Sequence, residues 1–440
     1  MQLFQWFINL GATVMIPILL CIFAIALGTK FSKAVKAGIT IGIGFIGLGL
    51  VIGLLVNSLG DAAKAMISNF GLTLNVIDVG WPATSAIAYS TALGSLAIPI
   101  GIGVNIVLLV FGLTKTLDID LWNFWHGAFI GSIIFATTNN FILGILSIIS
   151  YYLFIFWIAD FMVEDISKFY GFNNITFPHG TSAPGYLVAK PLNILFDLIP
   201  GLKKLDISPE KIQAKFGLFG DSTMIGLIIG IVMGILGGYD LASILNLGMK
   251  TAAVMMLMPR MVSLLMEGLE PISESASAFV KKHFPSRDIY IGMDSALSVG
   301  HPAVLSSSLI LVPITILLAV ILPGNKVLPF GDLATIPFII CLMAAVFRGN
   351  IIRTVLGGSI YMAIGLYIST WISPLFTIMA ENAKYDLGGN LQISSLADGS
   401  LWPTALFVFF GKYFAYIGVI GFAIVMLILL VYQNKIKGRK

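Results

Sequence analysis

Acidic residues beside apolar stretches are the first candidates for chemistry in this sequence. Asp294 follows the apolar residues 289–293, and Asp78 lies in a similar stretch at residues 76–80. A charged side chain in such a place costs free energy, so it is a functional candidate by default. A carboxylate at Asp294 could accept hydrogen bonds from sugar hydroxyls or act as a base toward one. Alternatively, Asp294 only caps a helix, since Asp is a good N-cap and Ser295 follows it.

Other polar residues could also contact a substrate. His179 and Thr181 lie in the turn-rich stretch 177–185. Loops on a rigid scaffold often carry function, although plain turn chemistry would select the same residues. His301 lies in a Gly-x-Pro stretch and is a plausible polar ligand. Asn139 lies inside an apolar run, where it could bond a polyol or a neighbouring helix.

A third histidine, His126, follows two tryptophans, Trp122 and Trp125. Aromatic residues in such clusters are typical of the membrane–water interface. We therefore interpret His126 as part of an interfacial anchor rather than as a site residue.

The sequence contains no motif for ATP hydrolysis, hydrolytic catalysis or metal binding. It lacks a GxxxxGK[ST] phosphate loop, an HExxH pair and a Ser-His-Asp order. Cys21 and Cys341 lie inside apolar runs without metal-ligand spacing. We therefore expect no metal, no cofactor and no phosphorylated residue in this chain.

The composition defines the elements that must position these residues. The chain has 440 residues, of which 58% are hydrophobic and only 10% are charged. A soluble domain carries about 25% charged residues. The composition therefore excludes a soluble enzyme, a nucleic-acid-binding protein and a disordered chain, and it predicts a polytopic membrane protein.

Apolar runs of sufficient length predict about eleven transmembrane helices in an all-α fold. They lie near residues 7–27, 38–57, 86–112, 127–149, 151–163, 216–236, 241–259, 303–322, 333–347, 354–373 and 405–432. Lysines at 30, 33 and 36 follow the first span, and a basic tail ends the chain. The positive-inside tendency then places the N-terminus outside and the C-terminus in the cytoplasm.

Two semi-polar stretches interrupt this pattern. Residues 66–85 contain Gly80-Trp81-Pro82, and residues 264–302 contain Gly300-His301-Pro302. Broken segments of this kind are tolerated at membrane depth only where they line a cavity inside the protein. We predict two re-entrant hairpins, near 66–98 and near 264–310.

A weak internal repeat relates the two halves. Residues 7–16 match 216–225, and 79–83 match 299–303, in the same order along the chain. We predict a first repeat of five spans over 1–200 and a second over 201–404, inserted in opposite orientations. The stretch 405–440 is then an extra span with a basic tail.

Several motifs make the sequence similar to a known family, the galactitol-type enzyme IIC of the bacterial phosphoenolpyruvate-dependent phosphotransferase system. This family is related to the ascorbate-type IIC. Together the motifs cover nearly the whole chain in family order. They lie at residues 76–82, 120–126, 178–183, 250–255, 257–260, 291–294, 328–336 and 348–350.

The resemblance implies a fold and a function. The fold has eleven spans, two re-entrant hairpins and inverted repeats. It forms a homodimer, in which a dimerising domain holds a substrate core that moves like an elevator. The IIC subunit binds a polyol such as galactitol, moves it inward and presents it to a phosphocysteine on IIB, which IIA recharges. This chain has no IIB-like domain, so IIA and IIB are expected as separate chains in a bacterial inner membrane system.

The resemblance also places the site at the two hairpins. The residues that we expect to bind substrate are Asp78, Trp81, Thr84, Ser85, Asn139, Thr181, Ser298 and His301. Asp294 and His179 are the candidate acceptors of the hydroxyl proton. The alternative function is an ion-coupled secondary transporter that leaves its sugar or polyol unmodified.

Overall fold

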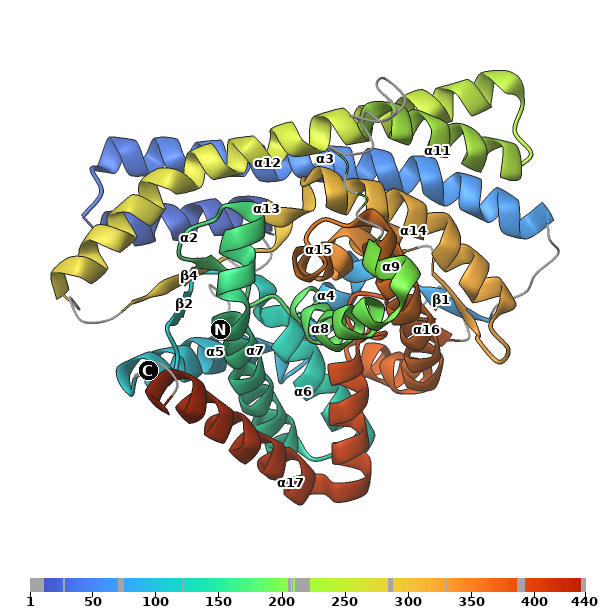
Figure 1. Ribbon diagram of the computed structural model, residues 1–440. Helices are drawn as coiled ribbons and strands as arrows, with labels where there is room; N and C mark the ends of the chain where they lie inside the picture. The colour runs from blue at the N-terminus through green and yellow to red at the C-terminus, as the bar shows by residue number, and fades with distance from the viewer. Residues whose placement is uncertain are drawn as a thin grey trace.

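The computed structural model describes residues 12–26, 28–69, 75–120, 122–204, 207, 209, 222–283, 288–329, 331–385 and 392–436. These residues form mostly helices (Figure 1). Six short strands of two or three residues lie between these helices along the described chain, and the sequence did not predict them.

The first half of the chain alternates helices with three short strands. In order, its main elements are α2 (Ala12–Ala26), α3 (Phe31–Asn69), β1 (Val76–Asp78), α4 (Gly80–Ser90), α5 (Gly94–Val110), β2 (Thr116–Asp118), the 3₁₀ turn η1 (Trp122–Phe124), α6 (Trp125–Thr138), α7 (Phe141–Tyr170), β3 (Ile175–Thr176), α8 (Ala183–Leu198) and α9 (Pro200–Lys204).

The second half presents nearly the same order. Its elements are α11 (Ser222–Leu236), α12 (Leu241–His283), β4 (Tyr290–Gly292), α13 (Ala296–Val299), α14 (Pro302–Ile321), β5 (Val327–Leu328), the 3₁₀ turn η3 (Leu333–Thr335), α15 (Ile336–Val346), α16 (Ile351–Asn382), β6 (Gln392–Ser394), α17 (Trp402–Val431) and η4 (Tyr432–Ile436).

The strands of the two halves are exchanged. One parallel sheet has the order β5-β1-β6 and the other has the order β2-β4-β3. Ile77 pairs with Leu328 and Ile393, and Ile291 pairs with Leu117 and Ile175. Each half therefore inserts its first strand between the second and third strands of the other half, which fixes the polar loops after these strands next to one another.

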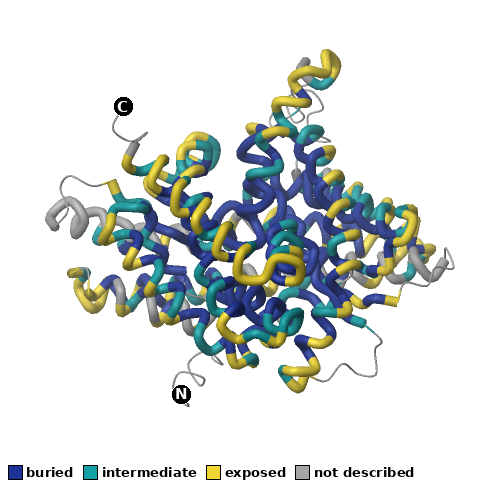
Figure 2. Tube along the Cα trace, turned by 90° about the horizontal axis from the view of Figure 1, so that it is seen from below, coloured by how far each residue is buried: buried dark blue, intermediate teal, exposed yellow. Residues whose placement is uncertain are grey.

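Two long helices cross one side of the molecule. The helix α3 has 39 residues, α12 has 43, and α12 lies along both α3 and α11 (Figure 1). Close approach depends on small residues, because a Cβ at Gly230 would collide with the backbone of Gly248. The remaining helices surround a buried interior, drawn dark blue in Figure 2.

The region predicted to be the first hairpin, near 66–98, contains a sharp bend, which lies after α4 and not at Gly80-Trp81-Pro82. The apolar run 86–112 is not one straight helix, because α4 and α5 are bent by 88° at residues 91–93. Gly94 makes this bend possible, since a Cβ there would collide with the Ala88 carbonyl. The hydroxyl of Thr91 accepts the Gly94 N–H at 2.9 Å.

The predicted division between 127–149 and 151–163 is also wrong. The helix α6 ends at Thr138, and α7 runs without interruption over 30 residues. Asn139 takes a left-handed conformation (φ 52°), and the Asn140 side chain caps α7 by accepting the Leu143 N–H. Asn350 caps α16 in the same way, by accepting the Arg353 N–H.

The other predicted spans need smaller changes. The run 38–57 belongs to α3, and 241–259 belongs to α12, which continues to His283, into the first part of the stretch predicted to be a hairpin near 264–310. The helix α17 is kinked at Ala415 (φ 45°), so its two arms meet at an angle (Figure 1). Among the described residues, five helices are long and apolar enough to cross a membrane, or six if the bent pair is one span.

Candidate functional site

His179 lies at the centre of a buried loop between β3 and α8. The Ser182 N–H donates to the carbonyl of His179 at 3.2 Å, which closes the loop. Gly180 is required at the next position, because a Cβ there would collide with Tyr151 and with the ring of His126. The glycine therefore lets two histidines approach each other, with ring centroids 5.1 Å apart.

The imidazole of His179 faces Asp294. The ring Nδ1 accepts the Thr181 N–H at 3.3 Å, so the neutral ring carries its proton on Nε2. Nε2 lies 3.6 Å from Asp294 Oδ1, which is too long for a direct hydrogen bond. Burial lowers the pKa of His179 to about 3, and the Asp294 charge only partly offsets this effect. The ring is therefore a neutral donor at pH 7.

Asp294 has a structural role and an open side. Its Oδ1 accepts the Ala296 N–H at 2.8 Å, as expected for a residue at the start of a helix. The side chain is nevertheless 18% exposed, compared with 7% for His179. The cap and the substrate interpretations of Asp294 are therefore compatible.

His126 is not an interfacial anchor. Its side chain is 1% exposed, and its Nδ1 lies 2.8 Å from Oδ2 of Asp398, which is also 1% exposed. Among the described residues, nothing bonds to His126 Nε2. The anchor interpretation is wrong because tryptophans beside a buried polar group give the same local pattern as an aromatic belt.

Serine residues connect the His179 loop to the second broken element. Ser182 Oγ and Ser295 Oγ lie 2.7 Å apart, and Ser298 Oγ donates to the Ser295 carbonyl at 2.6 Å. His301 lies one step further on, where its Nδ1 accepts the Ala303 N–H and caps α14. Its ring packs against Phe169, with centroids 4.4 Å apart.

A second polar centre surrounds Asp332, just after β5. Its Oδ1 accepts the Trp81 N–H at 2.6 Å and the Thr335 hydroxyl at 2.9 Å. Its Oδ2 accepts the Ser395 hydroxyl at 2.7 Å and the Ala397 N–H at 3.0 Å. Both carboxylate oxygens are therefore saturated by the protein itself.

Asp78 belongs to this saturated centre. Its Oδ2 accepts the Asp332 N–H at 2.8 Å, and its Oδ1 accepts the Gly80 N–H at 3.1 Å. Thr84 and Ser85 are buried on α4, where Thr84 Oγ1 donates to the Gly80 carbonyl.

The two centres touch through their loops. Thr181 Oγ1 donates to the Ala397 carbonyl at 3.4 Å, and Asp398, the next residue, holds His126. Asn139 lies apart from both centres. It is exposed at the far end of α6, about 20 Å from His126 at 1.5 Å of rise per helical residue.

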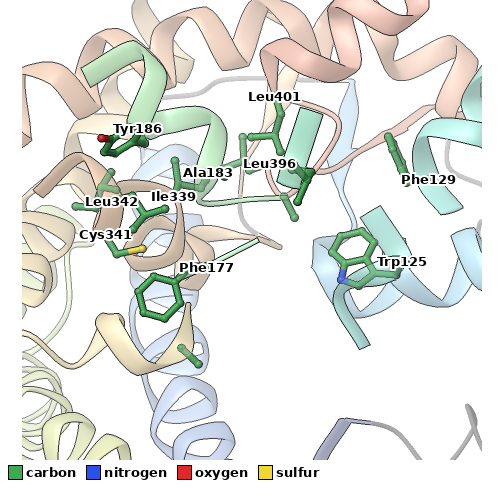
Figure 3. Close-up of a cluster of buried hydrophobic side chains, with 14 of the residues drawn as sticks. Trp125, Phe129, Phe177, Ala183, Tyr186, Ile339, Cys341, Leu342, Leu396 and Leu401 are labelled. Carbon is green, nitrogen blue, oxygen red and sulfur yellow. The ribbon is translucent and has the colours of Figure 1, made fainter. Parts of the chain in front are cut away.

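Apolar side chains enclose the polar loops. Phe177, Ala183 and Leu396 lie beside them, together with Cys341 on α15 (Figure 3). Trp125 packs on the ring of His126 at 4.0 Å. Among the described residues, no three His, Cys, Asp or Glu side chains are grouped closely enough to hold a metal ion. The site is therefore a largely buried cluster of hydrogen-bonding groups.

The structure corrects one step of the repeat alignment. Gly80-Trp81-Pro82 opens α4 directly after β1, whereas Gly300-His301-Pro302 separates α13 from α14. Ile77 and Ile291 are instead the equivalent positions, because Ile77 pairs with Leu328 in one sheet and Ile291 pairs with Leu117 in the other. Asp78 is then equivalent to Gly292, whereas the predicted match of 79–83 with 299–303 would place it opposite Ser298.

A broken-helix membrane protein with a buried polar centre belongs to the class of membrane transporters. The family described as PTS system sugar-specific permease component (EIIC-GAT) matches residues 6–388, and the chain belongs to this family. It is therefore a multi-pass cell-membrane protein that works with IIA and IIB subunits.

Three proteins of Escherichia coli are similar to this chain over most of its length. The galactitol-specific EIIC components of strains K12 and O157:H7 are each 42% identical over 399 residues, which is 91% of this chain and 88% of theirs. A further IIC permease component of strain K12 is 37% identical over 401 residues, which is 91% of this chain and 92% of its own.

Proposed function

We propose that this chain is the galactitol permease of a phosphotransferase system. It binds the polyol, carries it inward and presents it to a separate IIB subunit for phosphorylation. Family membership and 42% identity to galactitol-specific EIIC components support the substrate. The main observation for the site is a buried polar centre in which some hydrogen-bonding atoms lack a partner among the described residues. His126 Nε2 has no partner among the described residues, and Asp294 is partly exposed 3.6 Å from His179.

Polyols suit this centre because each hydroxyl both donates and accepts a hydrogen bond. A hydroxyl between His179 and Asp294 would accept from Nε2–H and donate to the carboxylate. A second hydroxyl would bond His126 Nε2. We place Thr181 and Ser298 beside these groups, since both lie in the loops that build the centre.

The other candidate residues have supporting roles in this proposal. Asp78, Trp81, Thr84 and Ser85 hold the first hairpin at the saturated Asp332 centre. His301 and Asn139 lie at helix ends, outside the substrate centre. The polyol contacts therefore concentrate on one of the two polar centres.

Asp294 is the proposed acceptor of the hydroxyl proton. As the polyol oxygen attacks phosphorus, a new O–P bond forms and the S–P bond of the IIB phosphocysteine breaks. The thiolate leaves on IIB, and the hydroxyl proton passes to the Asp294 carboxylate. His179, neutral and already bonded at Nδ1, orients the hydroxyl. Phosphorylation makes the neutral polyol an anion, which cannot return across the membrane.

The repeated element order supports an inverted duplication with eleven spans and two re-entrant hairpins. The first repeat would cover residues 1–200 and the second 201–404, and 405–440 would supply the extra, eleventh span. The N-terminus would lie outside the inner membrane and the basic C-terminus in the cytoplasm.

We further propose that α2, α3, α11 and α12 form a fixed dimerising domain, past which the other helices move as an elevator. Exposed apolar residues on α3 recur at helical spacing, as expected for a face that lipid or a second copy covers. They are Ile39, Ile43, Ile46 and Leu50.

Reconstitution tests this function directly. Proteoliposomes containing the purified chain would receive labelled galactitol outside and IIA, IIB and the phosphate-donor proteins inside. The expected product is internal galactitol phosphate, formed only when all components are present. Accumulation of unmodified galactitol driven by an ion gradient alone would contradict the proposal and favour a secondary transporter.

A further inference from the structure

Asp120 is a buried carboxylate with one unused oxygen. It follows β2, and its side chain is 5% exposed. Oδ2 accepts a hydrogen bond from the Asn123 side-chain amide. Oδ1 is buried and has no partner among the described residues. An acceptor left unpaired away from water costs free energy, so such an atom needs a reason.

Asp332 lies in the corresponding loop of the other half, one residue further along: it follows Leu328 by four residues, whereas Asp120 follows Leu117, the equivalent strand residue, by three. Asp120 follows β2, which pairs with the central strand β4, and Asp332 follows β5, which pairs with the central strand β1. Each also accepts from the side chain three residues further on, Asn123 for Asp120 and Thr335 for Asp332. The comparison is therefore between two carboxylates: four donors bond both oxygens of Asp332, whereas Oδ1 of Asp120 has no partner among the described residues.

The strand register explains why Asp120 lacks donors. Ile393 and Ile175 take equivalent positions, because each pairs with the central isoleucine of its sheet. Two residues later, Ser395 gives its hydroxyl to Asp332, whereas the equivalent residue is Phe177, which has none. Four residues later, the Ala397 N–H also bonds Asp332, whereas the His179 N–H bonds the Phe177 carbonyl instead.

The unused oxygen belongs to the region of the substrate centre. Asp118 pairs with Gly292, and the Ile119 N–H donates to the Gly292 carbonyl at 3.1 Å, so Asp120 and Asp294 each lie two residues beyond the same point of the sheet. The residue that replaces Ala397 in this half is His179, which faces Asp294 at 3.6 Å. Asp120 therefore lacks the two donors that Ser395 and Ala397 supply to Asp332, and it lacks them near His179 and Asp294, where the polyol is proposed to bind.

We propose that Asp120 binds a hydroxyl group of the polyol, which takes the place that the Ser395 hydroxyl takes on Asp332. This inference rests on the proposed function and adds a specificity-determining residue to it. A hydroxyl can donate to a carboxylate or accept from a carboxylic acid, so it satisfies Asp120 in either protonation state. A substrate without that hydroxyl would leave Oδ1 buried and unpaired, which is the strongest form of discrimination.

A double-mutant cycle between protein and substrate tests the inference. Binding of galactitol, and of analogues that each lack one hydroxyl, would be measured by calorimetry on the purified full chain in nanodiscs. In the wild type, one deoxy analogue should bind about 10- to 100-fold more weakly than galactitol. Asp120→Asn and Asp120→Ser should weaken galactitol binding similarly, and should bind that same analogue no worse than they bind galactitol.

Asp332→Asn is the matched control, because it changes the same residue type in the corresponding loop of the other half. It should lower thermal stability and leave the preference among the analogues as in the wild type. Two Asp120 variants are used so that misfolding of one leaves the test intact. If folded Asp120 variants keep the full wild-type preference among the analogues, the inference is wrong. If the wild type does not bind galactitol at all, the proposed function itself fails.

Discussion

The two polar centres of this molecule both lie in loops that follow the short strands, but they differ in whether their polar atoms are paired. Around Asp332, four donors from the protein saturate one carboxylate, and Asp78 locks the adjoining loop. Around His179, Asp294 stays partly exposed, and His126 Nε2 has no partner among the described residues. A buried polar group is stable only when it is paired. The difference therefore indicates that the first centre serves the fold and that the second waits for a ligand.

Removing the Asp294 charge should have the largest effect on function. Asp294→Asn removes the acceptor of the hydroxyl proton, so phosphorylation-coupled uptake of galactitol should fall about 10²- to 10⁴-fold. Uptake by reconstituted vesicles measures this loss. Asp288→Asn is the matched control, because Asp288 is 79% exposed and should leave uptake unchanged. Normal uptake by Asp294→Asn would remove the distinction between the two centres.

The saturated centre should respond in stability instead. Asp332→Asn turns an amide toward donors that need an acceptor, which should cost about 2–4 kcal/mol of folding free energy. Thermal unfolding of the purified protein would show a lower Tm, while the galactitol Kd of the folded fraction stays near that of the wild type. A variant with an unchanged Tm and a lost affinity would reverse the roles of the two centres.

Asp398 connects the centres and should have an intermediate effect. Its carboxyl fixes the ring orientation of His126, so Asp398→Asn should loosen His126 and weaken galactitol binding roughly 10-fold. The KM for transport should rise while kcat changes little, because Asp398 does not touch the reacting hydroxyl. A fall in kcat with an unchanged KM would contradict this positioning role.

The smallest predicted effect is on the pH dependence of stability. The folded pKa of His179 is about 3, below the ordinary value of about 6.5 expected in the unfolded chain. Its contribution to stability is therefore complete above pH 6.5 and is lost progressively as the pH falls from 6.5 toward 3. Between pH 7.5 and 5.5 this amounts to about 1.4 kcal/mol. The Tm of His179→Gln should fall less over this interval than that of the wild type, and equal falls would contradict a neutral buried ring.

The sequence identified single residues better than it identified their partners. Asp294 and His179 were predicted from a charge near an apolar run and from a turn-rich loop, and the structure brings them together. His126 was misassigned because its partner Asp398 is 272 residues away. Local patterns carry no record of such a contact, so a buried histidine and an interfacial histidine look alike beside tryptophan.

The fold was predictable at the level of helices, and less so at their ends. Apolar content predicted a helical membrane protein, and Gly and Pro marked the broken regions. The strand exchange was not predictable, because strands of two or three residues are too short to show a period of two. The break between α6 and α7 lies at Asn139 and Asn140 in an otherwise apolar run, where capping rather than hydropathy decides the boundary.

A structure of the protein with galactitol bound tests the central claim most directly. The account predicts density for the polyol between His179 and Asp294, with hydroxyl groups within hydrogen-bonding distance of His126 Nε2 and Asp120 Oδ1. The Asp332 centre should keep all four of its protein donors. Polyol density at Asp332 and Asp78, with the His179 centre empty, would contradict the account.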